Sequence, residues 1–414
     1  SNELSAVTAA NAPIYLIQVI IFGLMSGLTI LVSQYWGKQD PDAINRCMGF
    51  AMYAGLVIAA AMAAALFLFP HQVLLLVTDN RTLVEMGAPY LRIVGISYIF
   101  NAVSSVYVSM QRSAENPALG MKVFAASMLL NTFLNYCLIF GKFGAPALGI
   151  TGAAIATLTA RIVEFLIVLV YALLCRRIPL RPRLLLRPGR DTARSFTKYA
   201  TPVLFNETMW GLGTTVMTSI LGHMTDSADM LAAYTIMGNI DKFTTVSCFG
   251  LAGATAVILG KAIGEGTDKD RVYDLSWCLL IVSFLLGLGL AAALALVFIP
   301  YLYPLFSLSP LATEAAATLC VVYLILLPLK SFDISNITGV LRSGGDVRMA
   351  TIIDLTPLWC VAVPMAALTA LVLEAPLPLV CLGIYSENIC KMPLGVMRLR
   401  SRKWINDVTR RSAS

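Results

Sequence analysis

Apolar segments long enough to cross a lipid bilayer follow one another along almost the whole chain. A helix needs about 20 apolar residues to span the hydrocarbon core. Eleven segments reach that length: 11–35, 47–69, 86–110, 118–140, 149–175, 197–222, 231–259, 273–299, 313–340, 348–373 and 376–397. In a bilayer every backbone polar group must be hydrogen-bonded within the protein, so the segments predict an all-α polytopic membrane protein.

The composition agrees with this fold class. Of the 414 residues, 58% are hydrophobic and 13% are charged, whereas a soluble domain carries roughly 25% charged residues. The net charge of +7 would suit nucleic-acid binding only if basic tracts were interleaved with aromatic residues in a soluble fold. The sequence has no such tract, so we expect the lipid bilayer, and no nucleic acid, among the partners.

Cysteine and histidine do not predict a metal or redox site. The nine Cys are scattered singly, most of them in apolar segments, and the two His lie near segment ends. Disulfide frameworks and zinc sites need paired spacings that are absent from this sequence. We expect no cofactor and no structural metal, with the Cys acting as small buried hydrophobic residues.

The second half of the chain repeats the first at low identity. A shift of 227 positions brings Leu4 onto Leu231, Phe22-Gly23-Leu24 onto Phe249-Gly250-Leu251 and Gly37 onto Gly264, and a shift of 230 brings Arg112-Ser113 onto Arg342-Ser343. A duplicated membrane bundle is the usual architecture of a secondary transporter, with the site between the halves. We expect an N-terminal lobe at 1–175, an inter-lobe loop at 176–196, a C-terminal lobe at 197–398 and a basic tail at 399–414.

Basic residues lie overwhelmingly on one side of the predicted spans. That side includes seven Arg within 176–198 and the C-terminal tail, whereas the opposite loops hold only Arg81 and Lys142. Cytoplasmic loops carry such an excess, so the loop 176–196 and the C-terminus are predicted to be cytoplasmic at the plasma (inner) membrane. Eleven spans then leave residue 1 outside. By the repeat, we expect a twelfth helix before residue 1 that this sequence lacks; the alternative is an eleven-helix protein with an external N-terminus.

Several short motifs carry a family resemblance over essentially the whole chain. They are Ser33-Gln34-Tyr35-Trp36-Gly37-Lys38-Gln39-Asp40, Met110-Gln111-Arg112-Ser113 with Glu115-Asn116-Pro117, Gly149-Ile150-Thr151-Gly152-Ala153-Ala154, and Val340-Leu341-Arg342-Ser343-Gly344-Gly345-Asp346. In this order and spacing the chain resembles the multidrug and toxic compound extrusion (MATE) family. The resemblance implies twelve helices in two six-helix lobes around a cavity. It also implies a monomer that expels small organic substrates, chiefly cations, in exchange for Na⁺ or H⁺ by alternating access.

Two other functions stay open beside the antiporter. A lipid-linked oligosaccharide flippase of the same superfamily would need several unpaired Arg or Lys at mid-membrane to bind pyrophosphate. An intramembrane enzyme, a different class, would need a His, Cys or paired-Asp constellation on facing helices. The four intramembrane basic residues, two of them with adjacent acids, and the scattered Cys and His favour neither function. We therefore expect a transporter and not an enzyme.

Glu207 is the main candidate for the coupling chemistry. Charged residues inside a membrane are costly and therefore functional candidates by default, and Glu207 lies about ten residues into the span 197–222, next to Asn206. Trp210 and Thr214 follow at three and seven residues and share its face. An indole ring attracts cations, so this face would suit an organic cation. Acidic residues on this helix in several branches of the resembled family support the same role; the alternative is a structural Glu.

A second group of candidates lies on the later spans. Lys330 and Asp333 share a side of the span 313–340, and Asp333 resembles the family's acidic position on its tenth helix. Lys330 would form with Asp333 either a structural salt bridge or a switch, or would pair with Asp354 across helices. Asp241 interrupts the span 231–259. A Na⁺ coupling ion would bind at Glu207 or Asp333.

Further polar residues are secondary candidates with mainly structural interpretations. Their spacings predict two local ion pairs, Glu387 with Lys391 at i,i+4 and Arg161 with Glu164 at i,i+3. Asn131 and Asn135, also at i,i+4, share one face of their helix. The two Asn line the cavity or bond neighbouring helices, as polar residues in membranes often do.

Overall fold

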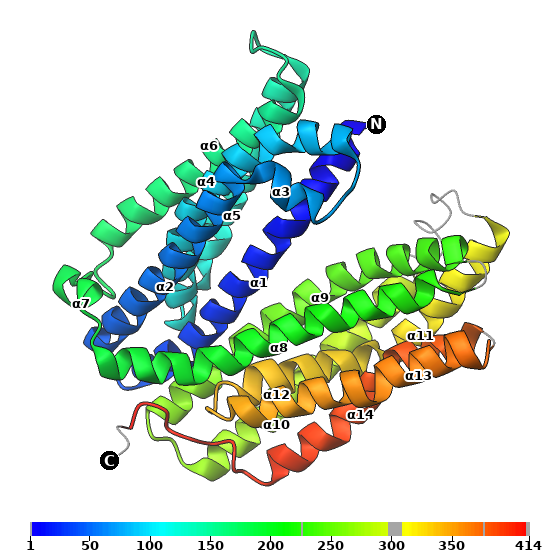
Figure 1. Cartoon of the computed structure of the whole chain (residues 1–414). Helices are drawn as coiled ribbons and strands as arrows, with labels where there is room; N and C mark the ends of the chain where they lie inside the picture. Colours follow the sequence, from blue (N-terminus) through cyan, green and yellow to red (C-terminus); the bar gives the residue numbers. More distant parts are fainter. Residues whose placement is uncertain (1, 225–226, 297–308, 376, 411–414) are drawn as a thin grey trace. The chain divides into compact units, whose positions relative to one another are not determined.

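The regular elements of this protein are helices. The structure, a computed structural model, describes residues 2–224, 227–296, 309–375 and 377–410, and within these ranges it contains no strand (Figure 1). Nine helices in the described ranges are long and apolar enough to cross a membrane. The predicted class, an all-α polytopic membrane protein, is confirmed.

The chain divides into two compact units, Ser1–Leu204 and Phe205–Ser414. The helices of the first unit are α1 (Asn2–Gly37), α2 (Pro41–Leu68), α3 (Pro70–Leu75), α4 (Arg81–Ser113), α5 (Pro117–Phe140), α6 (Gly149–Leu174), α7 (Pro182–Leu186) and the beginning of α8 (Arg190–Gly222). Helix α4 packs against α1, α2, α5 and α6. It therefore forms the centre of the first unit.

The second unit contains the rest of α8 and the later helices. These are α9 (Ser227–Gly264), α10 (Lys269–Ala293), α11 (Pro310–Ile334), η3 (Ser335–Leu341), α12 (Val347–Pro357), η4 (Leu358–Ala362), α13 (Val363–Ala367), η5 (Leu368–Val372) and α14 (Leu377–Arg400). Helix α11 packs against α9, α10 and α14. The three η segments are π-helical stretches inside two longer spans, and such stretches often mark functional sites.

Local sequence signals explain where several helices begin. Pro41, Pro117 and Pro310 occupy first-turn positions, where the missing N–H costs no hydrogen bond. The side chain of Asp40 accepts a hydrogen bond from the N–H of Ala43 at 3.0 Å, which caps α2. The eleven predicted spans correspond to these helices, but 197–222 in α8 and 376–397 in α14 are not among the nine that are apolar enough to cross; residues 297–299 and 376 of two predicted spans lie outside the described residues.

The polar connection between the units is more helical than the sequence suggests. We expected a loop over 176–196, but α7 forms within it and α8 already begins at Arg190. Asp191 lies in the first turn of α8, where a negative charge is favourable, and after Gly189 no proline interrupts the chain before Pro202. Hydropathy did not reveal this start because the first turns of α8 are polar.

Candidate functional site

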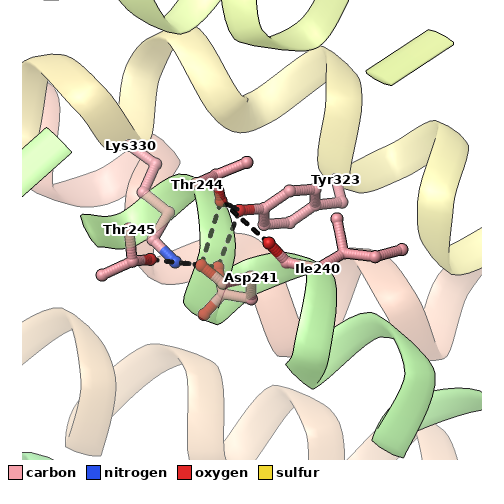
Figure 2. Close-up of polar contacts among 6 residues, drawn as sticks. All are labelled: Ile240, Asp241, Thr244, Thr245, Tyr323 and Lys330. Atoms are coloured by element: carbon pink, nitrogen blue, oxygen red, sulfur yellow. Dashed lines mark hydrogen bonds and ion pairs between the residues drawn. The ribbon is translucent and has the colours of Figure 1, made fainter. Parts of the chain in front are cut away.

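Asp241 is the centre of the first polar cluster of the second unit. Figure 2 shows that it accepts hydrogen bonds at Oδ1 from the hydroxyl of Tyr323, at 2.7 Å, and from Thr245, and that the same oxygen pairs with the ammonium of Lys330. Thr244 bonds the Tyr323 hydroxyl from the next turn of α9. Lys330 also lies 5.5 Å from the centre of the Tyr323 ring, a cation–π distance. The cluster joins α9 to α11.

The partner of Lys330 differs from both partners that the sequence suggested. Lys330 pairs with Asp241 and with neither Asp333 nor Asp354. Three residues along a helix leave two side chains roughly 60° apart around the axis, and here Lys330 is directed to α9. Asp333 instead lies close enough to Lys391 and Asp354 to interact with them electrostatically. The spacing of three therefore does not produce an ion pair.

Lys391 is the centre of the second cluster. Its Nζ lies 2.8 Å from Oδ1 of Asp354 and 2.9 Å from Oε2 of Glu387, so the predicted i,i+4 pair is confirmed. Asn206 donates from Nδ2 to Oδ2 of Asp354 at 2.7 Å. Lys391 is only 5% exposed, so its charge is compensated within the protein. Helices α8, α12 and α14 meet at this cluster.

Glu207 pairs with a residue that lies between two of the predicted spans, 313–340 and 348–373. Its Oε1 lies 3.0 Å from the guanidinium of Arg342, which follows η3 and is 2% exposed. Two sequence features single out Arg342: it recurs with Ser343 at the shift of 230, and it lies in the motif Val340–Asp346. Nothing in the sequence shows that its side chain reaches α8. Trp210, on the same helix as Glu207, is half-buried.

Asp333 and Asn336 are buried without full hydrogen bonding. Asp333 is 3% exposed and its Oδ2 has no partner among the described residues; Asn336 is fully buried and neither its Nδ2 nor its Oδ1 has one. The two residues flank the junction of α11 and η3. Buried polar atoms are nearly always hydrogen-bonded, so this junction has unused capacity to bind a proton or a cation.

Together these clusters contain more acids than bases. Glu207, Asp241, Asp333, Asp354 and Glu387 face Lys330, Arg342 and Lys391. When all eight are ionised, two negative charges remain without a compensating base. Uncompensated charge is costly at membrane depth, so the set is suited to taking up protons or small cations.

The polar residues of the first unit form the local pairs that their spacing predicts. Arg161 contacts Glu164 at 2.7 Å, and Asn135 donates to Asn131 at 3.0 Å. Asn131 also donates across to Thr157 of α6 at 3.4 Å, which is a helix-to-helix bond. Glu164 is fully buried.

No candidate metal centre is found in the part of the chain that the structure describes. No group there brings together three or more His, Cys, Asp or Glu in reach of one ion. The nine Cys are free thiols. Five are buried as expected, whereas Cys278 and Cys360 are exposed on the helix surface.

Comparison with known proteins gives consistent matches along the chain. A family model described as MatE matches residues 1–137 and 202–368. The uncharacterized transporter YisQ of Bacillus subtilis is 25% identical over 407 residues, covering 98% of this chain and 88% of the relative. The probable multidrug resistance protein NorM of Thermotoga maritima is 22% identical, covering 97% of this chain and 86% of the relative.

Solved structures share the fold at lower identity. One is described as the outward-facing conformation of a multidrug resistance MATE family transporter of the MOP superfamily; it superposes with a TM-score of 0.86 at 18% identity, covering 97% of this chain and 89% of that chain. Another is a MOP superfamily transporter from Pyrococcus furiosus, described as having a binding pocket of reverse polarity; its TM-score is 0.85 at 19% identity, with the same coverage.

Proposed function

This chain belongs to the MatE family of membrane transporters, and on that basis we propose that it is a secondary active antiporter that exports organic compounds in exchange for Na⁺ or H⁺. Cationic drugs or toxic metabolites are the proposed substrates. The names of several relatives as multidrug resistance proteins support this choice. Members of this family are transporters, so membership also argues against the intramembrane enzyme.

The excess of acids over bases in the clusters of the second unit is the observation that carries the proposal. An antiporter needs groups that bind its substrate and its coupling ion in alternation. An ionised carboxylate attracts an organic cation, and the same carboxylate, once protonated or bound to Na⁺, no longer does. Asp333 is the proposed site of the coupling ion, because its free Oδ2 and the free Oδ1 of Asn336 are oxygen ligands without another partner.

Lys391 can couple a change in the charge of Asp333 to the neighbouring acids Asp354 and Glu387. It already contacts Asp354 and Glu387, and Asp333 lies within electrostatic range of it. When Asp333 loses its proton or Na⁺, the ammonium is attracted toward Asp333 and its contact with Glu387 weakens. Binding at one carboxylate would then change the charge presented by another, which is the coupling that alternating access requires.

The remaining properties are proposed from the family and the charge distribution. The protein would act as a monomer in the plasma (inner) membrane, on small organic substrates. Its loop 176–196 and its C-terminus would be cytoplasmic, by the excess of Arg and Lys there. The lobes would be 1–175 and 197–398.

The flippase alternative is less well supported by the contacts. Pyrophosphate recognition needs basic side chains that are free to bind phosphate oxygens. Lys330, Arg342 and Lys391 are each paired with at least one acid, and the eight residues together are negative. The second unit therefore favours cations over phosphate groups.

Transport in proteoliposomes tests the proposal. An Na⁺ gradient and a pH gradient are imposed separately, and the movement of a fluorescent organic cation is followed. We expect one of the two gradients to drive transport, and we expect Glu207→Gln and Asp333→Asn each to abolish it while the protein still inserts and purifies. Glu265→Gln, a half-exposed acid beyond the candidate set, is the matched control and should transport normally. Wild-type rates in Glu207→Gln and Asp333→Asn would exclude these carboxylates as the coupling groups.

A further inference from the structure

The last described residues of the chain, 401–410, pack against the second unit. Trp404 is fully buried and donates from its indole N–H to the carbonyl of Leu399 at 3.2 Å. Its ring belongs to a hydrophobic cluster with residues from α9, α10, α11, η3, α12 and α14. Trp404 therefore anchors residues 401–410, which we name the C-terminal strap, to the rest of the second unit.

The strap touches the turn 342–346 at its backbone. The N–H of Asn406 donates to the carbonyl of Gly344 at 3.0 Å. A Cβ at Gly344 would lie 2.3 Å from the carbonyl oxygen of Trp404 and 2.5 Å from its ring, and Gly345 adopts a left-handed φ of +79°. Only glycine at position 344 permits so close an approach. The turn and the strap therefore form one backbone-to-backbone contact.

Two ion pairs hold the ends of this contact. Nε of Arg398 lies 2.5 Å from Oδ2 of Asp346, at the end of the turn. Arg402 pairs with Asp270 at the start of α10, and its guanidinium lies 4.5 Å from the centre of the Tyr273 ring. The strap is thus tied to both α10 and the turn.

The same turn carries the partner of Glu207. Arg342 begins it, and the carbonyl of Arg342 accepts a hydrogen bond from the N–H of Gly345 at 3.0 Å. On the other side, the N–H of Arg342 donates to the carbonyl of Ile337 at 3.2 Å, a π-helical bond of η3. The backbone of Arg342 is fixed between η3 and the turn, while its side chain extends to Glu207. Any contact that fixes the turn therefore also fixes the backbone position from which the Arg342 side chain extends.

We propose that the C-terminal strap holds Arg342 against Glu207, and that Trp404 is the positioning residue. The functional meaning of this contact rests on the proposed role of Glu207 in coupling. Without the strap, the turn 342–346 loses the hydrogen bond from Asn406 and the close contact with Trp404, and the guanidinium would sample other positions. The strap then determines how strongly the positive charge of Arg342 compensates the negative charge of Glu207.

The first unit contains a similar arrangement, which supports a specific role. After α6, Arg177 lies 4.8 Å from the centre of the Trp36 ring, and Arg181 pairs with Asp42 at the start of α2. The turn that follows α4 has a left-handed residue at Glu115, with φ +61°, as the turn after η3 has at Gly345. In each unit a segment that follows a long helix places Arg side chains against an aromatic ring and against an Asp at the start of an earlier helix, through Arg177 and Arg181 in the first unit and through Arg402 in the second. Such a contact set in both units is unlike the incidental packing of a chain end.

A stability cycle tests the positioning role without relying on transport. The melting temperature of the purified full chain in detergent is measured for wild type, Gly344→Ala, Glu207→Gln and the double variant. If the strap acts through the Arg342–Glu207 pair, Gly344→Ala should lose at least about half of its destabilising effect once Glu207 is neutral. Gly289→Ala, whose Cβ would meet no atom within 4 Å, is the matched control and should give additive changes. Additive changes for Gly344→Ala would overturn the proposal and leave only a structural strap.

Transport provides the second measurement, with variants of graded severity. We expect Trp404→Ala to lower the initial rate of organic-cation transport at least about threefold and Trp404→Phe to restore most of it, because Phe fills much of the same core volume. If Trp404→Ala does not fold, Arg402→Gln removes the half-exposed ion pair and should lower the rate in the same direction. Unchanged rates in all of these variants would contradict the proposal. If the wild type transports no organic cation but the stability cycle is non-additive, the proposed function would be excluded, while the positioning role of the strap would still be supported.

Discussion

At the scale of single residues, Lys391 compensates two acids with one buried ammonium. It contacts Asp354 and Glu387 at 2.8 and 2.9 Å and is 5% exposed. Removing one partner of a buried ion pair leaves the other charge uncompensated and costs about 3–5 kcal/mol. We therefore expect Lys391→Met to lower the free energy of unfolding by about that amount, measured by denaturant unfolding in detergent. The double variant Lys391→Met/Asp354→Asn should recover part of the loss, and a double variant less stable than the single one would contradict this assignment.

The same residues mark how far the sequence determines the candidate site. Glu387 with Lys391 and Arg161 with Glu164 follow from helical spacing, because residues three or four apart lie on one side of a helix; Lys330 and Asp333 show that a partner on another helix overrides this. The contact of Arg342 with Glu207 joins positions 135 apart. Helix packing sets such contacts, and periodicity within one helix contains no information about them.

At the scale of elements, the contact between α10 and α11 depends on a missing side chain. A Cβ at Gly287 would lie 2.7 Å from Cα of Pro328 and 2.8 Å from Cβ of Ser331. The close approach allows Ser283 to donate to the carbonyl of Ser331 at 2.8 Å, an interhelical bond of the kind that joins membrane helices.

Gly287→Ala tests this contact. Alanine favours a helix over glycine by about 1 kcal/mol, but at this position it would force two backbones apart. Overpacking typically costs about 1–3 kcal/mol, so we expect a net loss of stability that thermal unfolding detects. Gly289→Ala, two residues on and without close neighbours, should be neutral or slightly stabilising. Equal melting temperatures for the two variants would contradict the prediction and show that α10 can move away from α11 without a loss of stability.

Hydropathy predicts the spans of this protein well and their irregularities poorly. The long apolar runs give α5 and α6 nearly to the residue, because a bilayer span needs both length and apolarity, whereas α2 and α4 begin several residues before the predicted spans. The π-helical stretch Ser335–Leu341 has no hydropathy signal, since it changes the hydrogen-bond pattern and not the composition. It begins directly after Asp333 and Ile334, so the element that the sequence predicts least well adjoins the proposed ion site.

At the scale of the whole chain, the two units share turn geometry but differ in charge. Left-handed backbone occurs at Gln39 and Gly266, 227 positions apart, and at Glu115 and Gly345, 230 apart. These are the two shifts at which the sequence matches itself. The acids of the proposed site, by contrast, lie in the second unit. A common backbone plan with unequal charge suggests that the second unit carries most of the ion coupling.

That inequality predicts a measurable exchange of ions. The eight charged residues of the proposed site have two more acids than bases, so in the absence of substrate they should hold protons or Na⁺. An organic cation competes with them for the same carboxylates, so its binding should displace them, and by reciprocal linkage they should weaken its binding. We expect the purified protein, in weakly buffered detergent solution, to release protons or bound ²²Na⁺ when substrate is added.

The Asp333→Asn variant makes this exchange specific. Asparagine keeps the shape of the side chain but cannot hold a proton or a negative charge, so release should fall by about one ion per molecule bound. Glu265→Gln, which changes a half-exposed acid outside the set, should release as much as wild type. Substrate binding without release of either ion would mean that the acids stay fully charged beside their bases, and that coupling arises outside the second unit. Release that persists undiminished in Asp333→Asn would instead transfer the role to another acid of the set: Glu207, Asp241, Asp354 or Glu387.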